Sequence, residues 1–337
     1  MKILGIETSC DECSAAVVEN GKKIRSNVIA SQIEVHKPFY GVVPEIASRK
    51  HVEWISHVVL SALEKASVSL NEIDAVAATY RPGLIGSLLV GLSFAKGLSL
   101  SKNLPFVGVD HIQAHLYAPH LEQDIAFPYL GLIVSGGHTI IAMAEGVNRM
   151  AILGTTIDDA CGEAFDKVAK HFDFGYPGGV AIQRLARKGN ASAFSFPIPS
   201  LHKGDHPYDV SYSGLKTAVV HQIDQFWNRS YEKSPENIAA SFEKTAIDIV
   251  VNKLLRASRD TGVRRIVCGG GVSANTYLRQ RLADEEGIES IFPSLLLCTD
   301  NGAMIAGLGY HLVKTGQISP LDLNAQARVP SFRKTYP

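Results

Sequence analysis

The sequence has no long apolar run. None of its hydrophobic stretches reaches the roughly 18 residues that a membrane-spanning helix needs, although 46% of the 337 residues are hydrophobic. The amino terminus enters a predicted strand at Ile3, which leaves no room for a signal or transit peptide. We therefore expect a globular cytoplasmic protein that is long enough for two domains of ordinary size.

The sequence also lacks a net charge. Lys+Arg and Asp+Glu number 33 each, so the formal charge at pH 7 is zero. Proteins that bind nucleic acid on their own usually carry an excess of basic residues, because they neutralise phosphates. Any binding of nucleic acid by this chain must therefore use local basic patches or the help of a partner protein.

Reactive motifs are scarce. Among the five cysteines, Cys10 and Cys13 have the spacing of a redox or metal motif, but no second pair accompanies them at zinc spacing. Because a cytoplasmic protein keeps its thiols reduced, we predict that both are ordinary buried or loop residues. The sequence has neither a H-E-x-x-H motif nor a convincing Ser/His/Asp order, so peptidase chemistry has little support.

A pair of histidines stands out near the end of the first third of the chain. Residues 104–109 predict a short buried strand, and Asp110 suits the N-cap of a helix that begins at His111. On that helix His111 and His115 face the same way, at a spacing that lets two imidazoles hold one cation. Spacing alone leaves open that they are simply polar helix residues, because a metal site needs a third ligand.

The best candidate for the third ligand is Asp300. It follows a predicted strand over 290–298 and opens a predicted helix over 300–316. Aspartate in this place commonly caps a helix. It is also the carboxylate of the second half that is best placed to reach a metal held by the two histidines. Two histidines and one carboxylate with open positions are typical of a catalytic metal site.

One pattern of strands occurs twice. In each copy a strand is followed by a short polar turn, a second strand, a tight turn and a third strand. The predicted strands are 2–6, 14–18 and 23–30 in the first copy, and 129–134, 140–144 and 149–154 in the second. The pattern predicts a duplicated α/β fold whose halves begin about 125 residues apart.

The repeat suggests a division into domains. We expect residues 1–128 to form the first domain and residues 129–300 the second. An insertion is predicted around residues 190–235, where periodicity is weak. Residues 301–337 are expected to pack back on the first domain.

Two glycine-rich turns lie beside predicted strands, at 134–138 and 269–271. Glycine lets the backbone approach a ligand closely, and successive N–H groups can cradle a phosphate or carboxylate. A hairpin or close strand–helix packing would need the same glycines, so a plain structural role stays open. The turn at 7–11 occupies the matching place in the first half. Asp166 could meet ligand hydroxyls or an amine, or could simply be solvated.

With these features assembled, the chain resembles the tRNA threonylcarbamoyladenosine transferase family, called TsaD in bacteria and formerly glycoprotease or O-sialoglycoprotein endopeptidase. The resemblance covers nearly the whole chain in order. The matching segments are 3–12, 41–49, 82–91, 110–115, 134–139, 158–170, 176–179, 211–217, 268–275 and 298–306.

The resemblance implies a fold, an activity and partners. The fold is the duplicated actin-like/acetate-sugar kinase/Hsp70 (ASKHA) fold, with two βββαβαβα-type domains around a central cleft. The activity is transfer of a threonylcarbamoyl group from threonylcarbamoyl-adenylate to N6 of the adenosine 3′ of the anticodon, in tRNAs that read ANN codons. Bacterial members work with a paralogue, TsaB, and a small ATPase, TsaE.

The resemblance also implies site residues. It makes His111, His115 and Asp300 the ligands of one divalent metal, with iron(II) favoured over zinc. It implies no catalytic side chain beyond these ligands. The positions that match the binding site for an adenylate-type nucleotide substrate are Val134, Ser135, Gly136, Gly137, His138, Asp166, Gly179 and Asn275.

The chain departs from the family pattern at several places, among them Cys13 and Tyr80-Arg81, and two of the departures concern the site. Many relatives carry Glu-Gly where this chain has Gln113-Ala114, so the resemblance predicts that an acid near the metal ligands is missing. Many relatives also carry an aspartate shortly after Gly179, where this chain has Ile182 and Gln183. One contact to the ligand is therefore expected to differ.

Two other functions remain to be distinguished. A small-molecule phosphotransferase of the same fold class would use Glu7 and Asp11 near a magnesium ion, but would have no use for His111 and His115. A non-catalytic actin-like scaffold would need none of these residues.

Overall fold

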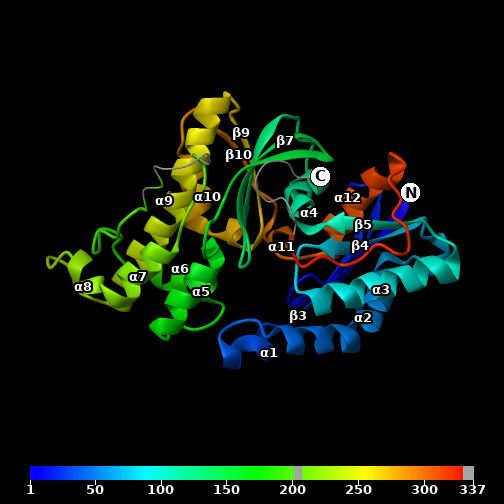
Figure 1. The fold of residues 1–337 in the computed structure, drawn as a ribbon, viewed down its shortest axis with the longest axis horizontal. Coiled ribbons are helices and arrows are strands. Elements are labelled where there is room, and N and C mark those ends of the chain that lie inside the picture. The colour runs from blue at the N-terminus through cyan, green and yellow to red at the C-terminus, as the bar shows by residue number, and fades with distance from the viewer. Residues whose placement is uncertain (200, 202–206, 329–337) are drawn as a thin grey trace.

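The computed structural model describes residues 1–199, 201 and 207–328, and it contains two five-stranded mixed sheets (Figure 1). The strand order is β3-β2-β1-β4-β5 in the first sheet and β10-β9-β6-β7-β8 in the second. In both sheets the first three strands of the half are antiparallel and the last two add in parallel. The predicted duplication is therefore confirmed.

The strands follow the apolar runs of the sequence. The first sheet contains β1 (Lys2–Glu7), β2 (Glu12–Glu19), β3 (Lys23–Ser31), β4 (Ala75–Arg81) and β5 (Phe106–Asp110). The second sheet contains β6 (Tyr129–Val134), β7 (Thr139–Gly146), β8 (Arg149–Thr155), β9 (Arg265–Gly269) and β10 (Glu289–Ile291).

The helices fall into two groups along the chain. The first half carries α1 (Ile33–His36), η1 (Lys37–Phe39), α2 (Pro44–Ala66), η2 (Leu70–Glu72), α3 (Ile85–Lys102), α4 (His111–Tyr117) and η3 (Ala118–Leu121). The remainder carries α5 (Cys161–His171), α6 (Gly178–Ala186), α7 (Ser213–His221), α8 (Ile223–Phe226), α9 (Pro235–Thr261), η4 (Gly271–Ala274), α10 (Thr276–Ala283), α11 (Leu295–Cys298) and α12 (Gly302–Lys314). No helix among the described residues is long and apolar enough to cross a membrane.

Helices cover both faces of the first sheet, as Figure 1 shows. Helices α2 and α3 pack on one face, and α12 packs on the other. Successive side chains of β1 point to opposite faces of the sheet. Ile3 packs in the core formed with α12, and Leu4 packs in the core formed with α2 and α3. A strand buried on both faces needs an almost continuous apolar sequence, and β1 has one.

Gly5 sets the position of α12. A Cβ atom at Gly5 would lie 2.3 Å from the carbonyl oxygen of Gly302 and 2.5 Å from the amide nitrogen of Ala306. The backbone of α12 therefore rests directly on β1, at a distance that only glycine permits. This contact fixes the start of α12, and with it Asp300, two residues before the helix.

Helix α4 lies between the two sheets. Ala114 and Tyr117 belong to the core formed with α12 and the first sheet. Ile112 and Leu116 belong to a separate core with strands of the second sheet. A short helix of seven residues is thereby held on two sides, and its third side carries the histidines.

The sequence prediction was wrong for the segment before Asp300. A strand was expected over 290–298, but β10 ends at Ile291 and a helical turn, α11, follows. The reason is Pro293, which cannot donate a hydrogen bond to a neighbouring strand. The chain therefore leaves the sheet early and turns back toward the first half.

The predicted start of the last helix was also wrong. The expected helix over 300–316 begins at Gly302, and its N-cap is Asn301, whose Oδ1 accepts a hydrogen bond from the backbone N–H of Met304 at 3.0 Å. Asparagine and aspartate cap helices about equally well, so sequence alone does not rank the two neighbours. Because Asn301 caps the helix, the carboxylate of Asp300 is available for another role.

The segment after α12 returns to the first sheet. The backbone N–H of Ser319 donates to Phe106 O, and that of Gln326 donates to Tyr80 O, both at 2.9 Å. The proposed domain limits at 128 and 300 stay a prediction. Part of the proposed insertion and the end of the C-terminal segment, residues 200, 202–206 and 329–337, lie outside the described residues.

Candidate metal centre

Asp110 sets the position of both histidines. Its Oδ1 accepts hydrogen bonds from the backbone N–H groups of Ile112 at 2.9 Å and Gln113 at 3.2 Å. The predicted N-cap is thus confirmed, and α4 begins at His111. His111 and His115 are 5% and 0% exposed, and their ring centroids lie 4.5 Å apart. The i, i+4 spacing brings the two imidazoles together, as expected.

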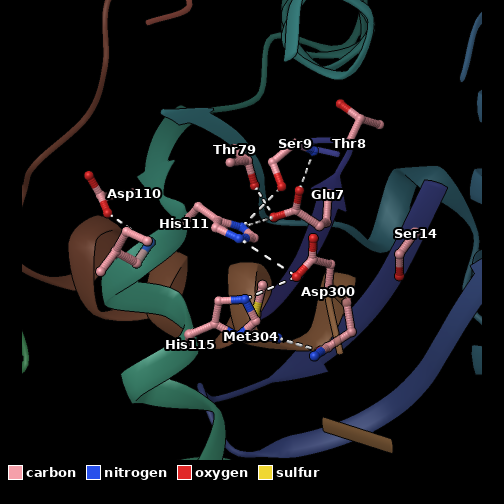
Figure 2. A network of polar contacts seen from close by, with 12 residues as sticks. Glu7, Thr8, Ser9, Ser14, Thr79, Asp110, His111, His115, Asp300 and Met304 are labelled. Carbon is pink, nitrogen blue, oxygen red and sulfur yellow. Dashed lines mark hydrogen bonds and ion pairs between the residues drawn. The ribbon is translucent and has the colours of Figure 1, made fainter. Parts of the chain in front are cut away.

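Asp300 completes a group of three donors, which Figure 2 shows from close by. Its Oδ1 lies 3.0 Å from Nε2 of His115 and 3.6 Å from Nε2 of His111. The three residues offer ligand atoms that all lie within 4.8 Å of one another. The chain crosses between the two halves once through α4 and once just before α12, and these two crossings supply the three donors.

A fourth side chain adjoins this group. Oε2 of Glu7 lies 3.0 Å from Nδ1 of His111, and Oγ of Ser9 lies 3.2 Å from the same nitrogen. Glu7 is the last residue of β1 and is fully buried. Glu7 thus places one acid beside the three donors, whereas the expected loss of an acid at Gln113-Ala114 stays a prediction.

The charges of the site are unbalanced without a cation. Burial alone would lower the pKa of His111, but the carboxylates of Asp300 and Glu7 outweigh burial and raise that pKa to about 9. Burial and the neighbouring His111 charge lower the pKa of His115. Burial opposes ionisation of Asp300, yet the two histidines hold the pKa of its carboxyl well below the ordinary value. Two carboxylates thus face the single positive charge of His111, and a divalent cation could replace the proton on its Nε2.

The donor set fits such a cation. Two imidazole nitrogens and one carboxylate oxygen suit iron(II) or zinc, and they leave coordination positions open. The N–H side of His111 already faces an acceptor, Glu7, as metal-bound histidines usually do.

The turn at 134–138 lies next to the group. The ring centroid of His138 is 6.5 Å from that of His111, and burial together with the neighbouring His111 charge lowers the pKa of His138 to about 3. A hairpin bond from the N–H of Ser135 to the carbonyl of His138, 2.8 Å long, closes this turn. Gly136 exposes its backbone at the tip.

The second glycine-rich turn meets the same place. A Cβ atom at Gly269 would lie 2.4 Å from the carbonyl oxygen of His115, and one at Gly270 would lie 2.5 Å from that of Val134. Gly270 also has a φ of +89°, which side-chain-bearing residues rarely adopt. Both turns therefore contact elements that carry the candidate metal ligands.

Three other expected residues lie in the second half, and two of them, Asp166 and Asn275, make hydrogen bonds there. Oδ1 of Asp166 accepts from the backbone N–H of Gly178 at 2.8 Å. Asn275 caps α10 through Oδ1, and its Nδ2 donates to Glu243 at 2.7 Å. A Cβ atom at Gly179 would meet no atom within 4 Å, so the space beside that backbone is open.

Gln183 lies in the region where the resemblance predicts a changed contact to the ligand. Its Oε1 accepts from the backbone N–H of Thr276 at 2.8 Å and ties α6 to α10. The side chain therefore has a structural partner in this chain. The cysteines are all free thiols, and burial raises the pKa of Cys13 to about 12, which makes it unreactive.

Comparison with known proteins decides the family. Residues 23–307 match the family model described as TsaD, tRNA N6-adenosine threonylcarbamoyltransferase. The chain belongs to the TsaD family. A TsaD relative from Treponema denticola is 61% identical over 334 residues, which cover 99% of each chain. One from Borreliella afzelii is 50% identical over 337 residues, which cover 100% of this chain and 96% of the relative. Both relatives bear the family's name.

Solved structures support the fold. HypF from T. kodakarensis matches with a TM-score of 0.64 and 13% identity, over 93% of this chain and 48% of that chain. At this identity the likeness concerns the fold alone. It agrees with the ASKHA fold class expected for a TsaD protein.

Proposed function

We propose that this TsaD-family protein transfers the threonylcarbamoyl group of threonylcarbamoyl-adenylate to N6 of the adenosine 3′ of the anticodon, in tRNAs that read ANN codons. The observation that carries the proposal is the buried group of His111, His115 and Asp300 beside two glycine-rich turns. An adenylate is already activated, so the enzyme has to position it and stabilise charge rather than supply a nucleophile. The three donors could take part in stabilising charge, and the two glycine-rich turns could position the adenylate.

We propose that His111, His115 and Asp300 hold one divalent metal per chain, iron(II) by preference and zinc as the alternative. When bound, the metal would act as a Lewis acid that polarises the acyl carbonyl or orients the threonyl end of the donor. The protein's own part is to present these donors already assembled. Burial lowers the pKa of His115 and of His138, which favours neutral imidazoles beside the cation.

The glycine-rich turns are the proposed adenylate site. Exposed backbone at Gly136 and Gly137 can approach the phosphate without a side chain in between. The nucleoside is proposed to occupy the open space beside Gly179 and to lie near Asn275, at the start of α10. Val134, Ser135, His138 and Asp166 complete the proposed binding positions.

Asp166 gives the adenylate site an expected pH dependence. Burial, with the nearby Asp11 charge, raises the pKa of Asp166 to about 6, although the N–H of Gly178 opposes the shift. The ionised carboxylate accepts ligand hydrogen bonds more strongly than the neutral acid, one of whose oxygens has become a donor. Below pH 6 the ionised fraction falls about tenfold per pH unit, so affinity for AMP, a non-reactive adenylate, should fall between pH 7 and pH 5.

Titration calorimetry with AMP across this range measures the effect. The variant Asp166→Asn should bind AMP more weakly at pH 7, and its affinity should change little with pH. An equal loss of affinity at low pH in the variant and the unmodified protein would assign the effect to another group.

Partners of two kinds are proposed besides tRNA. We propose a TsaB-like paralogue and a TsaE-like ATPase in the cytoplasm, where the tRNA substrate is found. The zero net charge of the chain supports help in tRNA binding. Helices α2 and α3 expose apolar side chains that suit contact with a protein partner, among them Val52 (65% exposed) and Leu60 (63%).

A transfer assay tests the function. The chain, alone and with both partners, is incubated with threonylcarbamoyl-adenylate and tRNA, and the digested nucleosides are identified by mass spectrometry. We expect threonylcarbamoyladenosine only in tRNAs that read ANN codons. ATP-dependent phosphorylation of a small molecule without tRNA would instead support the phosphotransferase. Partner binding without any turnover would support the scaffold.

A further inference from the structure

Glu7 is a buried carboxylate with three donors around it. The backbone N–H of Ser9 donates to Oε1 at 2.5 Å, and the hydroxyl of Thr79 donates to Oε2 at 2.6 Å. Nδ1 of His111 lies 3.0 Å from the same Oε2. Figure 2 shows these groups converging from β1, β4 and the start of α4. Burying a carboxylate is costly unless hydrogen bonds or a charge compensate it.

This arrangement fixes the tautomer of His111. An ionised carboxylate can only accept hydrogen bonds, so Nδ1 of His111 carries the proton. Nε2 of the same ring faces Oδ1 of Asp300, 3.6 Å away, and it presents a lone pair there once its own proton has been lost. A lone pair that faces a carboxylate is repelled by it unless a cation lies between them. Glu7 therefore turns the nitrogen that ligates a metal toward the other two donors.

The same carboxylate also holds the turn that follows β1. Its second oxygen accepts from Ser9, and Ser9 O in turn accepts from the N–H of Leu84 at 2.8 Å. A Cβ atom at Gly83 would lie 2.5 Å from Ser9 O, so the turn is packed tightly against the segment before α3. One side chain thus joins a metal donor to the turn at 7–11.

We propose that Glu7 is the positioning residue of this metal centre: it holds His111 in the Nδ1–H tautomer, so that Nε2 ligates the metal. The inference rests on the metal site of the proposed function. Glu7 acts through His111 and does not itself touch the metal.

The variant Glu7→Gln distinguishes the positioning of His111 from a general effect of burying a polar side chain at this place. Glutamine has the same shape, but only one of its two terminal atoms accepts. If its oxygen pairs with the N–H of Ser9, its NH₂ group faces Nδ1 of His111, and the ring must then carry its proton on Nε2. That nitrogen can no longer ligate. Loss of such an outer-shell partner typically weakens metal binding about 10- to 100-fold.

Two measurements on full-length protein test the proposal. Zinc affinity is measured by competition with a chromophoric chelator. The His111 tautomer is measured by NMR of metal-free, ¹⁵N-histidine-labelled protein at a pH where the ring is neutral, assigned with His111→Ala. For Glu7→Gln we expect zinc affinity about 10- to 100-fold weaker and a proton on Nε2 of His111. The matched control is Glu19→Gln, which removes a carboxylate paired with Arg25 at the far end of β2. It should bind zinc as the unmodified protein does.

Each outcome has a distinct meaning. If Glu7→Gln binds zinc as tightly as the unmodified protein and His111 keeps its tautomer, the positioning role is wrong while the metal site stands. If the unmodified protein binds no zinc, the metal site of the proposed function fails first. If Glu7→Gln does not fold, Glu7→Asp takes its place. That variant keeps the charge but withdraws it from His111 by one methylene, and unchanged zinc affinity would again overturn the proposal.

Discussion

Replacing His111 and His115 together by alanine is expected to abolish both metal content and transfer. The two imidazoles supply two of the three donors, and one carboxylate alone does not retain a transition metal. A Lewis acid stabilises the transition state by several kcal/mol. Removing about 4 kcal/mol of that stabilisation slows the reaction roughly 10³-fold. Metal analysis and the transfer assay, run on the same preparation, measure both effects.

The matched control removes two histidines elsewhere. His57 on α2 and His171 at the end of α5 are exposed, so the double change to alanine there should leave metal content and transfer unaltered. The site variant also leaves Glu7 and Asp300 as buried carboxylates without histidine partners, which lowers stability. Its melting temperature is therefore recorded alongside. A folded, metal-free site variant with full transfer activity would remove the metal from the mechanism.

Replacing Gly5 by alanine is expected to have the second largest effect, on stability and metal binding together. The added methyl group would lie 2.3 Å and 2.5 Å from backbone atoms of α12. Backbone cannot move aside as a side chain does, so α12 must shift away from β1. Overpacking of this kind costs up to about 3 kcal/mol. Because Asp300 lies just before α12, the shift should also weaken zinc binding.

Gly97 provides the control for that variant. It is an exposed residue of α3, and a Cβ atom there would meet nothing within 4 Å. Alanine favours a helix over glycine by up to about 1 kcal/mol, so Gly97→Ala should raise stability and leave zinc affinity alone. Urea denaturation and chelator competition measure both variants. Unchanged stability and zinc affinity in Gly5→Ala would show that α12 does not depend on this contact.

Much of the fold follows from local sequence patterns. The strands of both halves are short apolar runs bounded by turn residues, and their repetition predicts the duplication without any long-range information. The histidine pair is predicted for the same reason, since spacing and the Asp110 cap are local features. The structure confirms that cap and brings Asp300 to within 3.0 Å of His115.

The predictions from sequence failed where two neighbouring residues could both cap a helix, or where a contact joins residues far apart in the sequence. Asp300 and Asn301 are equally suited to cap α12, and only the packing of that helix on β1 decides between them. The contact between Glu7 and His111 spans 104 positions of sequence, and no local pattern reports it. The strand order does indicate this contact. Strands β1, β4 and β5 are parallel neighbours, so residues at their carboxyl ends meet at the same edge of the first sheet. Glu7 ends β1, and His111 follows β5.

The central claim is that a metal held by His111, His115 and Asp300 is required for transfer. Its most direct test is to strip the protein with a chelator, confirm the absence of metal, and titrate iron(II) or zinc back while transfer to tRNA is measured. The account predicts that transfer is lost on stripping and returns in full at one metal per chain. Full transfer by the stripped protein would contradict it.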